Sequence, residues 1–254
     1  MDNSRKVTGG DIMQFLHGKG MKILVNQYDI STFMNKIDSP RPIDSPETTT
    51  FGKNDKCYIP GAADATIGME GFWDGNVGAI DEILEKTFGA ASNTKMSWYY
   101  KGDSIEEAGY AANLIHNAYN VTSTLDNAVK ISAGGQSVVG RERVISLFST
   151  TVAMTGTGVT ATTPVDLGAT GNGGGAAYLH VTALNGGSIS SFAVQHASTQ
   201  DGGYTDVATF VAPTGATAQR VEIATGTDSI KRWVKISASG TKYDINFNIG
   251  INKK

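Results

Sequence analysis

The sequence is poor in several features on which other classes of protein depend. It has a single cysteine, Cys57, among 254 residues, so no internal disulfide can form and a reducing cytoplasm is indicated. Its net charge of −3 provides no basic field to hold duplex DNA. No apolar run approaches the roughly 20 residues that cross a bilayer, and the polar start MDNSRKVTGG has no signal-peptide core. We therefore expect no membrane insertion.

Motifs of catalysis and of metal binding are also missing. The four histidines lie far apart, without an HExxH, CxxC or calcium-loop pattern beside them. The glycine-rich run at 171–175 lacks the Gly-Lys-Ser/Thr ending of a phosphate loop, and there is no G-x-S-x-G elbow. We expect no catalytic residue, no metal and no cofactor, and the protein is not expected to be an enzyme.

Charge is unevenly distributed along the chain. Residues 1–155 contain 14 Lys/Arg and 18 Asp/Glu, whereas residues 156–254 contain 7 and 6. The second part is also richer in Gly, Ser and Thr, and the stretch 155–164 is typical of a short linker or of a passage from a strand to a loop. This change predicts two domains, 1–155 and 156–254.

The first domain shows mainly strand patterns and one helical pattern. Val77, Ile80, Ile83 and Leu84 recur at helical spacing and predict an amphipathic helix over 76–88. A weaker helical pattern covers 104–112. A proline-rich stretch between 37 and 51 predicts a long projecting loop or an edge segment. Alternating or β-branched segments predict strands at 21–25, 30–37, 48–51, 65–73, 95–100, 115–124, 128–133 and 143–152.

The second domain is predicted to be an all-β sandwich. Turn-forming sequences such as Asn185-Gly186-Gly187 and Ser239-Gly240 separate its strand patterns. The last pattern is a clean alternation, with Ile245, Phe247, Ile249 and Ile251 on one face and asparagines on the other. The predicted strands cover 178–184, 189–196, 204–210, 219–225, 232–238 and 243–251.

Four short motifs follow one another in the first domain. They are Thr48-Thr-Thr-Phe-Gly52, Tyr58-Ile-Pro-Gly61, the strand from Asp64 to Asp74 with its Gly-Phe-Trp-Asp ending, and Gly78-Ala-Ile-Asp81. Their order resembles that of the tail tube, or major tail, proteins of long-tailed (siphovirus-type) phages over about residues 4–155. Residues 156–254 are similar, more loosely, to the β-sandwich appendages of such proteins.

This resemblance implies a mainly β fold and a structural role. The N-terminal part would be a tail tube β-barrel or sandwich domain with one flanking α-helix, and the C-terminal part an Ig-like or jelly-roll-like sandwich. The subunits would form hexameric rings stacked into a tube through which double-stranded DNA passes at ejection. The family implies tape measure, tail terminator and distal tail proteins as partners. The location implied is the virion tail, after synthesis in the bacterial host cytoplasm.

Two sets of residues follow as candidate sites under this resemblance. The proline-rich loop is the candidate contact between rings, and the polar faces of alternating strands are the candidate lining of the channel, where polar and acidic side chains would let a polyanion slide. Ordinary solvent exposure is the alternative for both sets. The ring-stacking residues are Asp38, Arg41, Asp44, Glu47, Lys53, Asp55 and Lys56; the lumen-facing residues are Glu70, Asn120, Thr122, Thr124 and Asp126.

Two other functions compete with the tube. The C-terminal sandwich could be a module that binds glycans or a host surface, with Tyr178, Tyr204, Trp233 or Tyr243 as its aromatic contacts. Alternatively, the chain could be another virion protein, such as a decoration or connector subunit.

Overall fold

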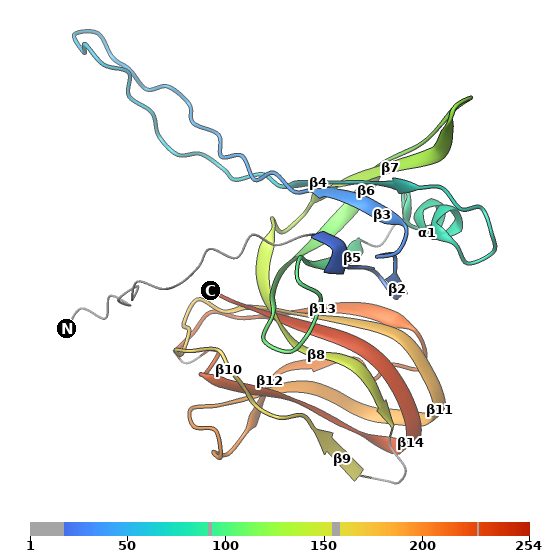
Figure 1. Ribbon diagram of the computed structural model, residues 1–254. Helices are drawn as coiled ribbons and strands as arrows, with labels where there is room; N and C mark the ends of the chain where they lie inside the picture. Colours follow the sequence, from blue (N-terminus) through green and yellow to red (C-terminus); the bar gives the residue numbers. More distant parts are fainter. Residues whose placement is uncertain (1–17, 91–92, 154–157, 228) are drawn as a thin grey trace, which may run out of the picture.

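The fold is mainly β, as predicted. The computed structural model describes residues 18–90, 93–153, 158–227 and 229–254. These residues form one α-helix, a 3-10 turn at Gly18–Gly20 and one continuous 14-stranded sheet. All ladders between the strands of this sheet are antiparallel. Figure 1 shows this sheet folded into an N-terminal half with the helix at its side, lying over a C-terminal sandwich. Residues 155–157, at the start of the predicted linker, lie outside the described ranges, whereas 158–161 form a short strand.

The N-terminal half is a curved sheet with the order β3-β4-β7-β6-β5-β1-β2. Its concave interior holds one hydrophobic core, in which Ile67, Met96, Trp98 and Ile131 meet the apolar face of the helix. In β4 and in the middle of β7, alternate residues are buried in this core and the others face away from it. The strands are β1 (Lys22–Val25), β2 (Tyr28–Asp29), β3 (Met34–Asp38), β4 (Thr66–Phe72), β5 (Thr94–Tyr99), β6 (Ala108–Thr124), β7 (Asn127–Ser137) and β8 (Glu142–Ala153).

The predicted helix forms, but it is shorter than 76–88. Helix α1 covers Ile80–Thr87 and buries Ile80, Ile83 and Leu84. It begins late because Asp74 and Asn76 do not cap it: their side chains bond to each other, with Asn76 Nδ2 2.7 Å from Asp74 Oδ1. The carboxylate of Glu82 instead accepts a hydrogen bond from the Gly78 N–H at 2.5 Å.

Three other local predictions in this half were wrong. The stretch 104–112 is not helical; its second part belongs to β6, where it pairs with both β5 and β8. The strand predicted at 30–37 is interrupted by a turn and continues as β3. No strand forms at 48–51. Isolated bridges between Ile43 and Ala63 and between Glu47 and Tyr58 instead hold 39–64 as a long two-legged projection, which we call the arm (Figure 1).

The C-terminal half is a sandwich built from two very long strands. β11 (Gly175–Ala197) and β14 (Trp233–Lys253) pair along almost their whole length and bend together, so that each contributes to both layers. The turns predicted at 185–187 and 239–240 are therefore absent. The bend uses the same residues: Gly186 has a φ of +89°, and 185–188 form the exposed outer corner. The shorter strands are β9 (Gly158–Ala161), β10 (Val165–Asp166), β12 (Thr205–Phe210) and β13 (Thr217–Ile223).

The first part of β11 is covered on both faces. All residues from Gly175 to Val181 are buried. Ala177, Leu179 and Val181 face the sandwich core with Phe192 and Phe247. The alternate residues Ala176 and Tyr178 pack against Tyr99, Ala111 and Val144 of the N-terminal half. A strand buried on both faces loses the polar alternation that marks a one-sided sheet.

Polar side chains also join the two halves at this layer. Glu142 accepts hydrogen bonds from Tyr178 at 2.5 Å and from Arg220 at 3.2 Å, with Glu142 and Arg220 side chains 4% and 10% exposed. Tyr99 donates to Asn248 at 3.1 Å. The Ser97 hydroxyl lies 2.8 Å from His180 Nε2.

The domain division at 155/156 stays a prediction. Contacts between β8 and the C-terminal half determine what a chain divided at this point would expose. β8 lies before this boundary, yet it pairs with β14 from Ile145 to Ala153. Its Leu147 belongs to the sandwich core. A chain ending at residue 155 would therefore leave an unpaired strand edge and an uncovered apolar layer.

Candidate functional site

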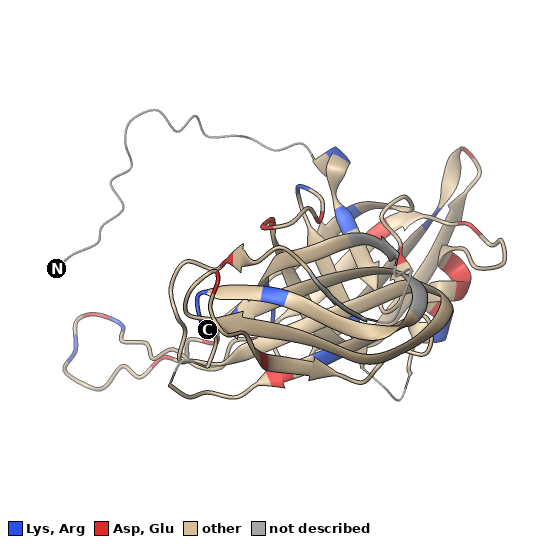
Figure 2. Cartoon of the chain, turned by 90° about the horizontal axis from the view of Figure 1, so that it is seen from below, with Lys and Arg blue, Asp and Glu red and all other residues tan. Residues whose placement is uncertain are grey.

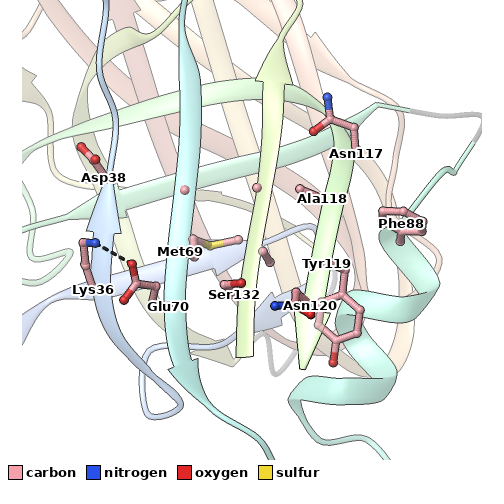
Figure 3. Close-up of a pocket in the computed structure, with 13 residues that line it drawn as sticks. Lys36, Asp38, Met69, Glu70, Phe88, Asn117, Ala118, Tyr119, Asn120 and Ser132 are labelled. Carbon is pink, nitrogen blue, oxygen red and sulfur yellow. Dashed lines mark hydrogen bonds and ion pairs between the residues drawn. The ribbon is translucent and has the colours of Figure 1, made fainter. Parts of the chain in front are cut away.

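The candidate site is the four-stranded part of the sheet formed by β3, β4, β7 and β6. Alternate residues point to the α1 side, and the others point to an open face. On this open face the ladders align Lys36, Glu70, Ser132 and Asn120 in one row across the four strands. Figure 3 shows these side chains side by side on the open face. If a sheet curves around a space with this face inward, a row of this kind lines the wall of that space.

The open face is hollowed and lined mainly by polar and small residues. A depression of about 490 Å³ lies over it, and its lining includes Asp38, Gly68, Glu70, Asn120 and Ser132. β7 approaches β6 so closely at Gly135 that only glycine fits, because a Cβ at this position would lie 2.6 Å from the carbonyl oxygen of Ile115. That approach accompanies the bulge in β6 between His116 and Ala118.

The charge on this face is balanced. Lys36 Nζ lies 2.5 Å from Glu70 Oε1, and this carboxylate raises the pKa of the lysine, with a smaller contribution from Asp38. Lys130 lies opposite Thr122 and Phe72 in the next row. Two lysines thus accompany the two acids. The sequence prediction omitted Lys36, Lys130 and Ser132, although the alternation of Lys130 and Ser132 with Val129 and Ile131 could have identified two of them.

The predicted lumen residues are only partly brought together. Glu70 and Asn120 share one row, and Thr122 follows in the next. Thr124 and Asp126 lie farther out, because Thr124 pairs with Asn127 at the end of the β6–β7 hairpin and Asp126 is in its turn. The assignment of these five residues to a channel remains a prediction.

Both edges of the four-stranded part are open. Within the described ranges β3 pairs with β4 alone. β6 pairs with β5 only up to Leu114, and beyond it the Gly89 N–H donates to the His116 carbonyl. From Tyr119 to Thr124 the described structure provides a backbone partner on the β7 side only. Unpaired edges of this kind are templates for another strand.

The arm carries the predicted stacking residues, apart from Asp38. Asp38 is in β3 at the base of the arm, whereas the other six lie along its legs and tip. The two legs are joined by backbone hydrogen bonds such as Thr48 N–H to the Cys57 carbonyl at 2.8 Å, and by the Lys56–Glu47 ion pair at 2.9 Å. Figure 2 shows charged residues of both signs on the arm and helix, while the sandwich strands are largely uncharged.

His116 and His180 make hydrogen bonds within the fold. His180 and Ser97 are fully buried, and His180 Nδ1 lies 2.7 Å from the Asn26 carbonyl oxygen instead of a carboxylate. His116 lies 2.9 Å from Thr87 Oγ1. Among the residues described, no three His, Cys, Asp or Glu side chains are grouped to hold a metal, and no helix is long and apolar enough to cross a membrane.

Of the four aromatic residues considered for glycan binding, one is buried and two have a cation over the ring. Tyr178 is fully buried, so this assignment was wrong; the cause is the packing of the N-terminal half against β11. Tyr204 is covered by Lys235, whose Nζ lies 4.0 Å from the ring centroid. Arg232 lies over Trp233 at 5.4 Å. The side chain of Tyr243 is outside the described set.

Comparisons with known proteins gave solved structures only. No family model matches the chain, and no curated protein matches it. A structure of the SPP1 tail tube is 15% identical, with a TM-score of 0.40 over 50% of this chain and 78% of that one. A chain from the virion of a native gene transfer agent is 9% identical, with a TM-score of 0.41 over 51% and 98%. The SPP1 Dit protein, described as a hub adsorption apparatus, is 10% identical, with a TM-score of 0.36 over 92% and 99%. At these TM-scores the likeness does not assign a function.

Proposed function

We propose that this chain is a structural virion protein, the tail tube subunit of a long-tailed phage, which forms hexameric rings stacked into a channel for DNA. The observation that supports this most is the four-stranded part of the sheet, because it combines two open edges with a hollowed face that carries a row of polar side chains. An isolated sheet with two open edges is prone to add strands. A closed ring removes both edges at once.

The strand order suits such a ring. β3 and β6 are the outer strands of four successive antiparallel strands. The β6 edge of one copy can therefore pair antiparallel with the β3 edge of the next, and this head-to-tail contact repeats until the ring closes. Six copies would give a barrel of about 24 strands, with a backbone diameter of about 45 to 50 Å at usual strand spacing and tilt. A DNA duplex fits inside once side chains are allowed for.

The open face would then line the channel. Its lysines and acids balance, and the row of Lys36, Glu70, Ser132 and Asn120 includes an internal ion pair. Basic side chains bind DNA tightly because they displace counterions from its phosphates. A lining without net positive charge lacks this gain in free energy. DNA would slide along this wall, and no catalytic step is involved.

The arm would cross between rings. It leaves the end of β3 and returns into the start of β4, so it projects from one end of the strands that would form the channel wall (Figure 1). The proposed stacking residues, from Asp38 to Lys56, lie at its base and along it. Tape measure, tail terminator and distal tail proteins would be the partners inside and at the ends of such a tube, in the virion tail.

A proline at the β3 edge tests the ring. Asn35 lies in a β3 irregularity and has no ladder partner in β4, because the register passes from Met34–Gly71 to Lys36–Glu70. Asn35→Pro places a proline in the edge strand at a position outside the β3–β4 residue pairs, so that these pairs remain. We expect negative-stain microscopy to show rings or tubes for the unchanged chain and at least tenfold fewer for Asn35→Pro.

Asn35→Ala is the matched control and should assemble normally. Near-ultraviolet circular dichroism of the proline variant must remain native for the result to count as an assembly defect. An unchanged chain that stays monomeric at every concentration and salt would contradict the proposal. Rings that never stack would indicate a single-ring tail component instead of a tube.

A further inference from the structure

The apolar side of the four-stranded part extends farther than the core that covers it. Along β7, Ala133 and Ile131 are buried, but the next residue on the same face, Val129, is only partly covered. Its neighbours across the sheet continue the pattern: the Trp73 N–H donates to the Val129 carbonyl at 3.0 Å, and Val121 lies opposite Ile131. Trp73 and Val121 are exposed large apolar side chains.

Two further exposed apolar residues lie in connections at this same end of the strands. Val77, in the loop before α1, is 98% exposed, and Leu125, in the turn of the β6–β7 hairpin, is fully exposed. Val77 was predicted on the buried side of the helix, but α1 begins three residues later. Exposed large apolar residues scattered singly need no explanation, whereas a group at one end of a sheet indicates a contact. We call this group the end patch: Trp73, Val77, Val121, Leu125 and Val129.

The arm carries the complementary group. Its tip residue Phe51 is fully exposed, and Ile43, Tyr58 and Ile59 are each more than half exposed. The arm continues from the end of β3 at Asp38 and enters β4 at Thr66, while the end patch lies where β4 ends at Phe72. The two apolar groups are therefore at opposite ends of the same strands, as Figure 1 shows for the arm and the β6–β7 hairpin.

We propose that the end patch is the docking surface for the arm of a second copy of this chain. This inference rests on the proposed tube and names the contact between its rings. Because the arm and the end patch lie at opposite ends of the strands, a symmetric dimer of two copies cannot form both contacts. The contact is heterologous and repeats along an axis, which produces a filament instead of a closed dimer.

The dimensions and charges are consistent with this occupant. With about 12 residues in each leg, the extended arm reaches about 40 Å, whereas the seven residues of β4 span about 23 Å. Lys53 beside the tip and Asp126 beside Leu125 have opposite charges, and neither has an ion pair within the described residues. Docking would bring a lysine toward an aspartate at the edge of an apolar contact.

The native cysteine gives a direct test in the full chain. Cys57 is exposed on the arm and is the only cysteine in the sequence. Leu125→Cys adds a second thiol in the end patch, and a short bismaleimide should then link copies into a ladder of covalent multimers. Val211→Cys, at another exposed apolar residue that lies outside both surfaces, is the control and should give at least tenfold less ladder.

Loss of the apolar surface is the second test. The double variant Trp73→Ser, Leu125→Ser should form rings but reduce the stacked fraction in micrographs by at least about tenfold. Phe72→Ser removes a neighbouring exposed side chain on the opposite face and should stack normally.

The outcomes separate this inference from the proposed tube. Normal tubes from the double variant, together with no covalent ladder from the Leu125→Cys variant, would overturn the docking surface and leave the tube proposal standing. A ladder in a protein that forms no closed rings would support the docking surface and contradict the ring. A monomeric protein without a ladder would overturn both.

Discussion

Replacing Arg220 by alanine is expected to lower the free energy of unfolding by about 3 to 5 kcal/mol, because it leaves the Glu142 carboxylate buried without its main partner. Two guanidinium nitrogens of Arg220 lie 3.2 Å from Glu142 oxygens, and Tyr178 donates to the same carboxylate. Lys254 Nζ, 3.7 Å from Glu142 Oε1, is the remaining cation. Its side chain is largely exposed, so the lower end of this range is expected. Urea unfolding monitored by tryptophan fluorescence measures the change.

A double variant separates the ion pair from the packing around it. Arg220→Met together with Glu142→Gln removes both charges, and we expect it to recover at least half of the lost stability. Lys56→Ala, which removes a cation from an ion pair on the exposed arm, should leave the midpoint of urea unfolding unchanged. If Arg220→Ala unfolds within about 1 kcal/mol of the unchanged chain, the buried network does not hold the two halves together.

Acid is expected to destabilise the protein through His180 before the carboxylates titrate. Complete burial lowers the pKa of His180 to about 4 from its usual 6.5, an effect opposed in part by the Asn26 carbonyl. The unfolded chain therefore binds a proton near pH 6.5 and the folded chain only near pH 4. Stability is fully present above pH 6.5 and is lost as the pH falls, by about 3 kcal/mol between pH 7 and pH 4.

His180→Gln is the variant that isolates this effect. Glutamine keeps a donor and an acceptor for Asn26 and Ser97 but does not titrate in this range. In the variant, the unfolding free energy should change much less with pH between about pH 7 and pH 4 than in the unchanged protein. His116, whose pKa burial also lowers, leaves a smaller slope of the same sign. Equal slopes in the two proteins would show that His180 can be protonated in the folded state at little cost.

Alternation was a reliable guide where only one face of a strand is buried. It located β4 and β7 to within a few residues, and it placed Ile245, Phe247, Ile249 and Ile251 in the core. It also placed Glu70, Asn120 and Thr122 on one face. Lys36 was missed because its position depends on pairing with Glu70, and a pairing register between distant segments is not visible in local sequence.

The failures come from the fold as a whole. Asn248 and Asn252 lie on the predicted polar face of the last strand, yet both are buried because the N-terminal half covers that side of β14. The glycine and asparagine residues at 185–187 have the composition of a tight turn. A bend in two long paired strands needs the same residues, so composition alone does not distinguish the two. Whether the open face lines a channel depends on other copies of the chain.

The sharing of β8 between the two halves also sets an order of events during synthesis. β8 ends at Ala153, and the strand that completes its second edge, β14, begins 80 residues later at Trp233. Contacts such as Tyr99 with Asn248 span 149 residues, so much of the joint has high contact order and forms slowly. While the ribosome adds those 80 residues, at about 5 to 20 residues per second, the nascent N-terminal half presents an unpaired edge. The chain therefore spends several seconds in an aggregation-prone form, in which a chaperone that shields exposed strands would raise the yield.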